Sequence, residues 1–132
     1  MTTDMPSPNY TVSANVTYVT LTTWDIGVVG RSDAAGSNCY HAAIQLTSGG
    51  TVQTLSLKKE VNGVFTALDS YTLTGADLLT AGSTGLIELV MNGSSISVKW
   101  RGSQRIAVTN TVFAGPGRSG IWSGVATSTT GP

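Results

Sequence analysis

Late in the chain, two runs of residues in which apolar and polar side chains alternate lie on either side of an Asn-Gly pair. The apolar residues that share one face of these runs, on either side of Asn92-Gly93, are Ile87, Leu89, Met91, Ile96, Val98 and Trp100. Successive side chains of a β-strand point to opposite sides, so a period of two is typical of strands. Asn and Gly tolerate the positive φ angles of a tight hairpin turn better than other residues do. The pattern therefore predicts a β-hairpin with one buried face that packs against a second layer.

Similar runs recur along the chain and are separated by turn residues. They predict strands within residues 10–18, 26–31, 39–47, 51–60, 64–71, 105–108 and 115–123, besides the two of the hairpin. Asn62-Gly63 predicts a second hairpin, and imperfect alternation within 51–60 indicates a β-bulge. A single helical turn is expected within 74–79, and no segment has the pattern of an amphipathic helix. About ten strands joined by Gly- and Asn-rich turns predict an all-β antiparallel sandwich of the jelly-roll type.

The chain has the length of one domain, since 132 residues suffice for a hydrophobic core. We expect a polar lead-in over residues 1–8, the jelly-roll sandwich over 9–124 and a linker-like tail over 125–132. The tail is rich in Ser, Thr and Gly, which is typical of linkers.

Composition and charge argue against several kinds of partner. Seven basic and seven acidic residues balance, so the chain lacks the clustered positive charge that nucleic acid binding requires. No apolar stretch approaches the ~20 residues that cross a bilayer, so membrane insertion is not expected. The first residues lack the basic and apolar regions of a signal peptide. Cys39 is the single cysteine, which excludes an internal disulfide and favours a small buried side chain.

The acidic residues argue against catalysis. Glycoside hydrolysis needs two carboxylates that flank the scissile bond, yet Glu60 and Glu88 are the only glutamates and neither has an acidic residue two or four positions away. His41 is the only histidine, and the G-x-S-x-G motif of serine hydrolases is absent. We therefore predict no catalytic residues and expect that the protein is not an enzyme.

Metal and cofactor binding are also not expected. One His, one Cys and scattered Asp residues do not make a zinc set. Calcium requires several oxygen ligands that converge, for which Asp33 is retained as a candidate. The prediction is that the protein binds no metal and no cofactor.

Carbohydrate recognition requires an accessible aromatic ring and polar neighbours that bind hydroxyl groups. Trp100 is in phase with the buried face of the hairpin and is predicted to be a core residue. The candidate carbohydrate-binding residues are Trp24 and Trp122 as ring platforms, with Asp25, Arg31, His41 and Gln45 as polar neighbours. In the alternative interpretation, all three tryptophans fill the core and the domain acts through its shape.

Five segments together resemble the concanavalin A-like lectin/glucanase jelly rolls, also called laminin-G-like sandwiches. They are Gly27–Asp33, Tyr40–Gln45, Leu55–Gly63, Leu86–Val98 and Phe113–Ile121. The resemblance implies two antiparallel sheets, one of them concave, with ligands often bound on the concave side or at loop rims. Compared with that pattern the chain is short at both ends, so it is expected to lack terminal strands of the full fold.

Strands missing from a sheet leave edges that can pair with another chain. We therefore expect a homo-oligomer or a larger virion assembly, formed through the strands at 9–20 and 117–123. The resemblance implies a non-catalytic structural or adhesion module of a bacteriophage virion that contacts a cell-surface glycan, located on the virion or an extracellular surface. The alternative is a carbohydrate-binding module of a secreted bacterial protein.

Overall fold

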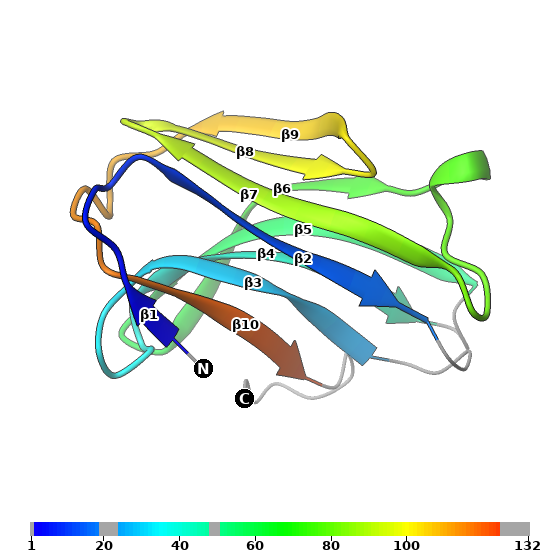
Figure 1. Ribbon diagram of the computed structural model, residues 1–132, viewed down its shortest axis with the longest axis horizontal. Coiled ribbons are helices and arrows are strands. Elements are labelled where there is room, and N and C mark those ends of the chain that lie inside the picture. The colour runs from blue at the N-terminus through cyan, green and yellow to red at the C-terminus, as the bar shows by residue number, and fades with distance from the viewer. Residues whose placement is uncertain (1, 19–23, 48–50, 125–132) are drawn as a thin grey trace.

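The computed structural model describes residues 2–18, 24–47 and 51–124. These residues form ten β-strands and one short 3-10 helix, arranged as two antiparallel sheets that pack face to face (Figure 1). The predicted all-β sandwich is therefore confirmed. The tail predicted over 125–132 lies outside the described residues. Among the described residues, no helix has the length and hydropathy to cross a bilayer.

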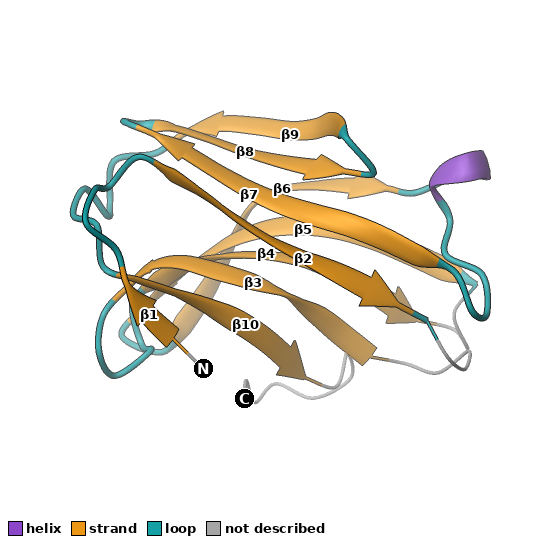
Figure 2. Ribbon diagram, in the orientation of Figure 1, coloured by secondary structure: helices purple, strands orange, loops and turns teal. Residues whose placement is uncertain are grey.

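The two sheets differ in size, as Figure 2 shows. The larger has six strands in the spatial order β1 (Thr2–Asp4), β10 (Arg118–Gly124), β3 (Trp24–Ser32), β4 (Cys39–Thr47), β5 (Val52–Val61) and β6 (Val64–Thr72). The smaller has four strands in the order β2 (Tyr10–Thr17), β7 (Thr84–Asn92), β8 (Ser95–Trp100) and β9 (Ser103–Thr109). The 3-10 helix, Gly75–Asp77, lies on the connection from β6 to β7.

The core lies between the facing sides of the two sheets. Its fully buried side chains include Tyr40, Ile44, Leu55, Leu57, Ile87, Leu89, Ile96 and Trp100. The apolar face predicted for the β7–β8 hairpin is thus the inner face of the smaller sheet. Trp100 is 0 % exposed, and its indole N–H donates a 2.8 Å hydrogen bond to the Asp77 carbonyl. The prediction that Trp100 is a core residue is confirmed.

The two predicted hairpins are present, and one of them has a different turn. Asn62 and Gly63 occupy the β5–β6 turn with φ angles of 51° and 81°, as predicted. In the β7–β8 hairpin, however, Asn92 pairs with Ser95, so the turn residues are Gly93 and Ser94 rather than Asn92 and Gly93. Only Gly93 has a positive φ, 59°, which is the arrangement of a turn with Gly at its first central position. The register of the β7–β8 ladder therefore places the turn one residue later than the sequence predicts.

The chain ends contribute differently from the sequence expectation. Residues 2–4, expected within a polar lead-in, form β1 and pair with residues 118–120 of β10. β2 lies at an edge of the smaller sheet, whereas β10 is the second strand of the larger one. Ile121 pairs in register with the core residue Val28 but is 65 % exposed. The apolar side chain of Ile121 is therefore exposed to solvent beside β2, an edge strand of the smaller sheet.

Candidate functional site

Strand alternation separates the six-stranded sheet into a core face and an outer face. In β4, Tyr40, Ala42, Ile44 and Leu46 point into the core, so His41 and Gln45 point away from it. Asp25 is paired with Gln45, and Trp122 is paired with Gly27, which is itself paired with Ala43. We call the side turned away from the four-stranded sheet the outer face. It carries four of the six predicted site residues, namely Asp25, His41, Gln45 and Trp122.

The outer face is concave. Phe65 of β6 and Trp122 of β10 have ring centroids 6.4 Å apart, although β5, β4 and β3 lie between their strands. A flat sheet would separate β6 from β10 by about 19 Å. The sheet therefore curls so that both rings close over His41, whose ring lies 4.8 Å from Phe65 and 5.3 Å from Trp122. This explains why His41 is only 4 % exposed although no strand of the described residues covers the outer face.

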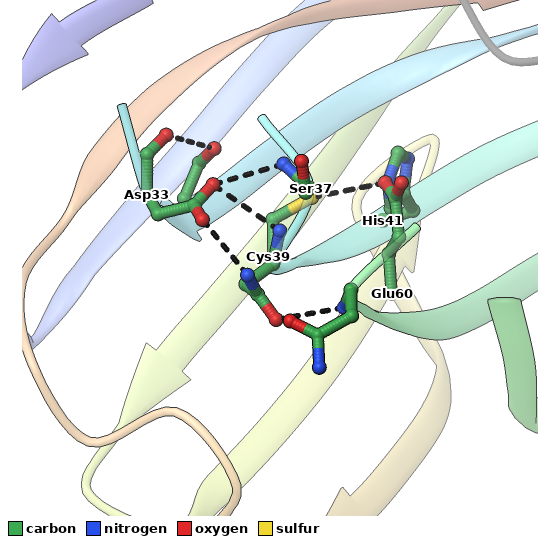
Figure 3. A network of polar contacts seen from close by, with 8 residues as sticks. Asp33, Ser37, Cys39, His41 and Glu60 are labelled. Atoms are coloured by element: carbon green, nitrogen blue, oxygen red, sulfur yellow. Dashed lines mark hydrogen bonds and ion pairs between the residues drawn. The ribbon is translucent and has the colours of Figure 1, made fainter. Parts of the chain in front are cut away.

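His41 also belongs to a compact polar cluster, which Figure 3 shows from close by. The Nε2 atom of His41 lies 3.1 Å from Cys39 Sγ and 2.9 Å from Glu60 Oε1. Cys39 Sγ lies 3.7 Å from the same carboxylate oxygen. All three side chains are buried, with Cys39 2 % and Glu60 9 % exposed. The chain's single cysteine, its single histidine and one of its two glutamates therefore meet at one point.

Burial sets the protonation of this cluster. Burial, together with the nearby Glu60 carboxylate, raises the pKa of Cys39 to about 12, so the group is a thiol at neutral pH. Burial also lowers the pKa of His41, although the hydrogen bond to Glu60 opposes that shift. The neutral tautomer of His41 with its proton on Nε2 can donate to Glu60. The Nδ1 atom is buried and has no hydrogen-bond partner among the described residues.

This arrangement differs from a nucleophile–histidine–acid triad. In such a triad the nucleophile and the acid contact opposite nitrogens of the imidazole, so that one orients the ring and the other gives up a proton. Here Cys39 and Glu60 both approach Nε2. The ring is therefore not held as a proton relay between them.

A network of hydrogen bonds positions the cluster from the adjoining turn. The Asp33 carboxylate accepts bonds from the backbone N–H groups of Ser37 and Asn38 and from the Asn38 side chain, as Figure 3 shows. The bond from Asn38 holds the pKa of Asp33 below its usual value. The Asn38 side chain in turn accepts from the Asn62 N–H, which ties this loop to the β5–β6 turn. The candidate calcium ligand Asp33 is thus engaged in a loop, and the one group of three or more His, Cys, Asp or Glu ligands within the described residues is Cys39, His41 and Glu60.

One predicted site residue, Arg31, does not join the outer face, and the side chain of another, Trp24, is not described. Arg31 has a φ of 48°, which interrupts the alternation of β3, and its buried side chain donates to the carbonyls of Pro8 and Phe113. It lines a separate pocket of about 110 Å³ at the loops near Gly93 and Asn110. Trp24 begins β3 opposite Leu46, and its side chain lies outside the described part of the structure.

Two residues of the outer face were not predicted as site residues from the sequence, Phe65 and Glu60. The sequence presents Glu60 only as a candidate catalytic acid, whereas strand pairing places it directly opposite Cys39. Phe65 pairs with Glu60 across the Asn62-Gly63 hairpin, which the sequence did predict. That hairpin was the available signal for placing Phe65 on the same face as Glu60.

The sequence matches no protein-family profile and no curated protein. Solved structures do match. A carbohydrate-binding module, CBM66 from Bacillus subtilis, is 14 % identical with a TM-score of 0.74, over 96 % of this chain and 70 % of that one. A family 16 endo-glucanase from Bacteroides ovatus is 9 % identical with a TM-score of 0.62, over 91 % and 58 %. The enzymatically active domain of bacteriophage CBA120 tailspike protein 2 is 15 % identical with a TM-score of 0.59, over 95 % and 23 %.

At sequence identities of 14 %, 9 % and 15 %, the similarity to these structures establishes the fold alone. The chain is a concanavalin A-like jelly-roll sandwich, which confirms the resemblance seen in its sequence.

Proposed function

We propose that this chain is a non-catalytic module that binds a glycan on the concave outer face, beside Trp122. The observation that carries the proposal is a group of polar atoms on this face. Asp25 Oδ1, His41 Nδ1 and Trp122 Nε1 are each buried and have no hydrogen-bond partner among the described residues. Buried polar atoms in proteins nearly always have a partner, and those that lack one frequently mark a place for water or a ligand. A ligand rich in hydroxyl groups, or water ordered by it, would supply the missing bonds.

The aromatic and charged groups of the face suit the same ligand. Trp122 is half-buried, and a partly exposed indole provides the flat surface on which a pyranose ring stacks. The residue beside it across the ladder is Gly27, which has no side chain to cover the ring. Burial raises the pKa of Asp25, while the neighbouring Lys58 opposes that shift. Asp25 and Lys58 together offer an acceptor and a donor for hydroxyl groups.

The placement of the carboxylates supports binding rather than hydrolysis. Glu88 pairs with Ser13 and Lys99 in the smaller sheet, between the core residues Ile87 and Leu89, and so faces outward on the opposite side of the sandwich from Glu60. Asp25 shares the concave face with Glu60, but the register places it level with Thr54, six residues along β5 from Glu60. That separation is about 20 Å, whereas the two carboxylates of glycosidases lie about 5–9.5 Å apart.

The proposed binding predicts a loss of affinity when the Trp122 ring is removed. In a glycan array followed by calorimetry with the best ligand, we expect Trp122→Ala to weaken binding at least about tenfold, because the stacking surface is lost. Trp122→Phe, which keeps a ring, should retain most of the affinity. Glu88→Gln, on the far side of the sandwich, is the matched control and should bind like the wild type. Undiminished binding by a folded Trp122→Ala variant would refute the site.

For the biological setting, the proposal is an adhesion module of a bacteriophage virion that assembles as a homo-oligomer on the virion surface. The likeness to a phage tailspike domain and the exposed Ile121 beside the β2 edge support it. A carbohydrate-binding module of a secreted bacterial protein is the alternative, supported by the higher TM-score of the Bacillus module.

Sedimentation velocity separates the two settings. If the exposed surface around Ile121 on β10 is an assembly surface, the protein should sediment as an oligomer. Ile121→Asp should then shift it towards monomer, because a charge would be buried in the contact. Thr11→Asp, at another exposed position, on β2, tests the adjoining edge. A wild-type protein that remains monomeric at high concentration would contradict the assembly proposal and favour the secreted module.

A further inference from the structure

We infer that Cys39, His41 and Glu60 form a binding site for one zinc ion, or a divalent transition metal of the same class, beneath the rings of Phe65 and Trp122. The inference does not require the proposed glycan binding, although the two sites share His41, through Nε2 for the metal and Nδ1 for the glycan. It revises the sequence-based expectation of no metal, which rested on the presence of a single Cys and a single His. Strand pairing supplies the third ligand, because Glu60 lies opposite Cys39.

The three ligand atoms are spaced so that one ion can bind all of them. Their separations are 3.1 Å, 2.9 Å and 3.7 Å, so a circle through Cys39 Sγ, His41 Nε2 and Glu60 Oε1 has a radius of about 1.9 Å. Zinc binds nitrogen and oxygen at about 2.0–2.2 Å and sulfur at about 2.3 Å. An ion slightly out of the plane of the three atoms therefore reaches each of them without a change in the backbone.

Hydrogen bonding alone explains the arrangement poorly. The Nε2 atom carries at most one proton, yet Cys39 Sγ and Glu60 Oε1 both approach it, and the sulfur-to-carboxylate contact is long at 3.7 Å. Meanwhile His41 Nδ1 is buried, and no described residue forms a hydrogen bond with it. A metal ion at the meeting point uses the Nε2 lone pair and moves the ring proton to Nδ1, which is then the nitrogen left to bind water.

Charge and ligand type favour a zinc-class ion. A thiolate and a carboxylate together neutralise a divalent cation, so the buried site would carry no net charge. Metal binding displaces the thiol proton even though the pKa of Cys39 is high in its absence, because a coordinated thiol is deprotonated. A set of one sulfur, one nitrogen and one oxygen suits zinc and its neighbours, whereas calcium and magnesium prefer oxygen alone. Lys58, opposite His41 in the register, is the neighbouring cation, and its charge acts on both His41 and Asp25.

The test is a titration of the metal-free protein with ZnCl₂ and, separately, with CoCl₂. We expect one equivalent of zinc to be retained after dialysis, a higher melting temperature, and a cobalt spectrum with an intense thiolate-to-metal charge-transfer band. Cys39→Ser should abolish that band, and Glu60→Gln should weaken zinc binding at least about tenfold, since even loss of a group that supports a ligand costs that much. Glu88→Gln, the other glutamate, is the matched control and should behave like the wild type.

Two results would overturn the inference. One is a wild-type protein that retains far less than one equivalent of zinc. The other is a cobalt spectrum without a thiolate band, or with a band that persists in Cys39→Ser. If circular dichroism shows that a variant is unfolded, the wild-type cobalt spectrum decides the question alone. Because no readout involves a glycan, failure here leaves the proposed glycan binding unaffected.

Discussion

Replacing Trp100 by alanine is expected to lower the free energy of unfolding by about 3–5 kcal/mol, the usual cost of deleting a large buried aromatic side chain. The ring is fully buried, and its N–H bonds to the Asp77 carbonyl, which would lose that partner. It also lies against Gly85, where an added Cβ would come 2.4 Å from ring carbons. The ring is therefore closely packed on that side, and its removal would leave a cavity between the sheets.

Urea unfolding followed by far-ultraviolet circular dichroism measures this change. Val64→Ala is the control, because Val64 is 65 % exposed and its truncation should change the stability by no more than about 0.5 kcal/mol. A loss below about 1 kcal/mol for Trp100→Ala would mean that the two sheets do not close over this ring.

Replacing Gly27 by alanine is expected to destabilise the fold by about 3 kcal/mol or more, at the upper end of the cost of overpacking. A Cβ at this position would lie 1.9 Å from the Ala42 carbonyl oxygen and 2.6 Å from the Ala43 Cα. Both are backbone atoms of β4, so no side-chain rotation relieves the clash. β3 and β4 would have to move apart, and the outer face would be distorted with them.

Gly115→Ala is the matched control, since apart from its two chain neighbours no atom of the described residues lies within 4 Å of a Cβ at this position, and its φ is not in the left-handed region. It should unfold at the same urea concentration as the wild type. If Gly27→Ala were as stable as the wild type, the backbone of β3 could not lie as close to β4 at Gly27 as it does in the structure.

The sequence predicted the strands and the two hairpins because a period of two and the Asn-Gly turns are local signals. It failed by one residue at Asn92, since the cross-strand pair of Asn92 with Ser95 selects the turn and cannot be read from one strand alone. It expected no strand within the first eight residues, where three polar or β-branched residues pair with β10 only because that edge is available.

Part of the candidate site was predicted because strand alternation is also a local signal in the sequence. Asp25, His41, Gln45 and Trp122 share a face because alternation carries through β3, β4 and β10. Arg31 does not share it, because its positive φ ends the alternation there. The meeting of Cys39 with Glu60 depends on the register between β4 and β5, which sequence periodicity does not fix.

An NMR titration of the ¹⁵N-labelled protein with the glycan selected by the array tests glycan binding on the concave outer face most directly. If the glycan binds there, the indole N–H resonance of Trp122 and the amides of Asp25 and Gln45 should shift together and saturate at one equivalent. The amides around Glu88, on the other side of the sandwich, should not move. Shifts confined to the four-stranded sheet, or a saturating titration that leaves Trp122 unchanged, would contradict binding on the concave face.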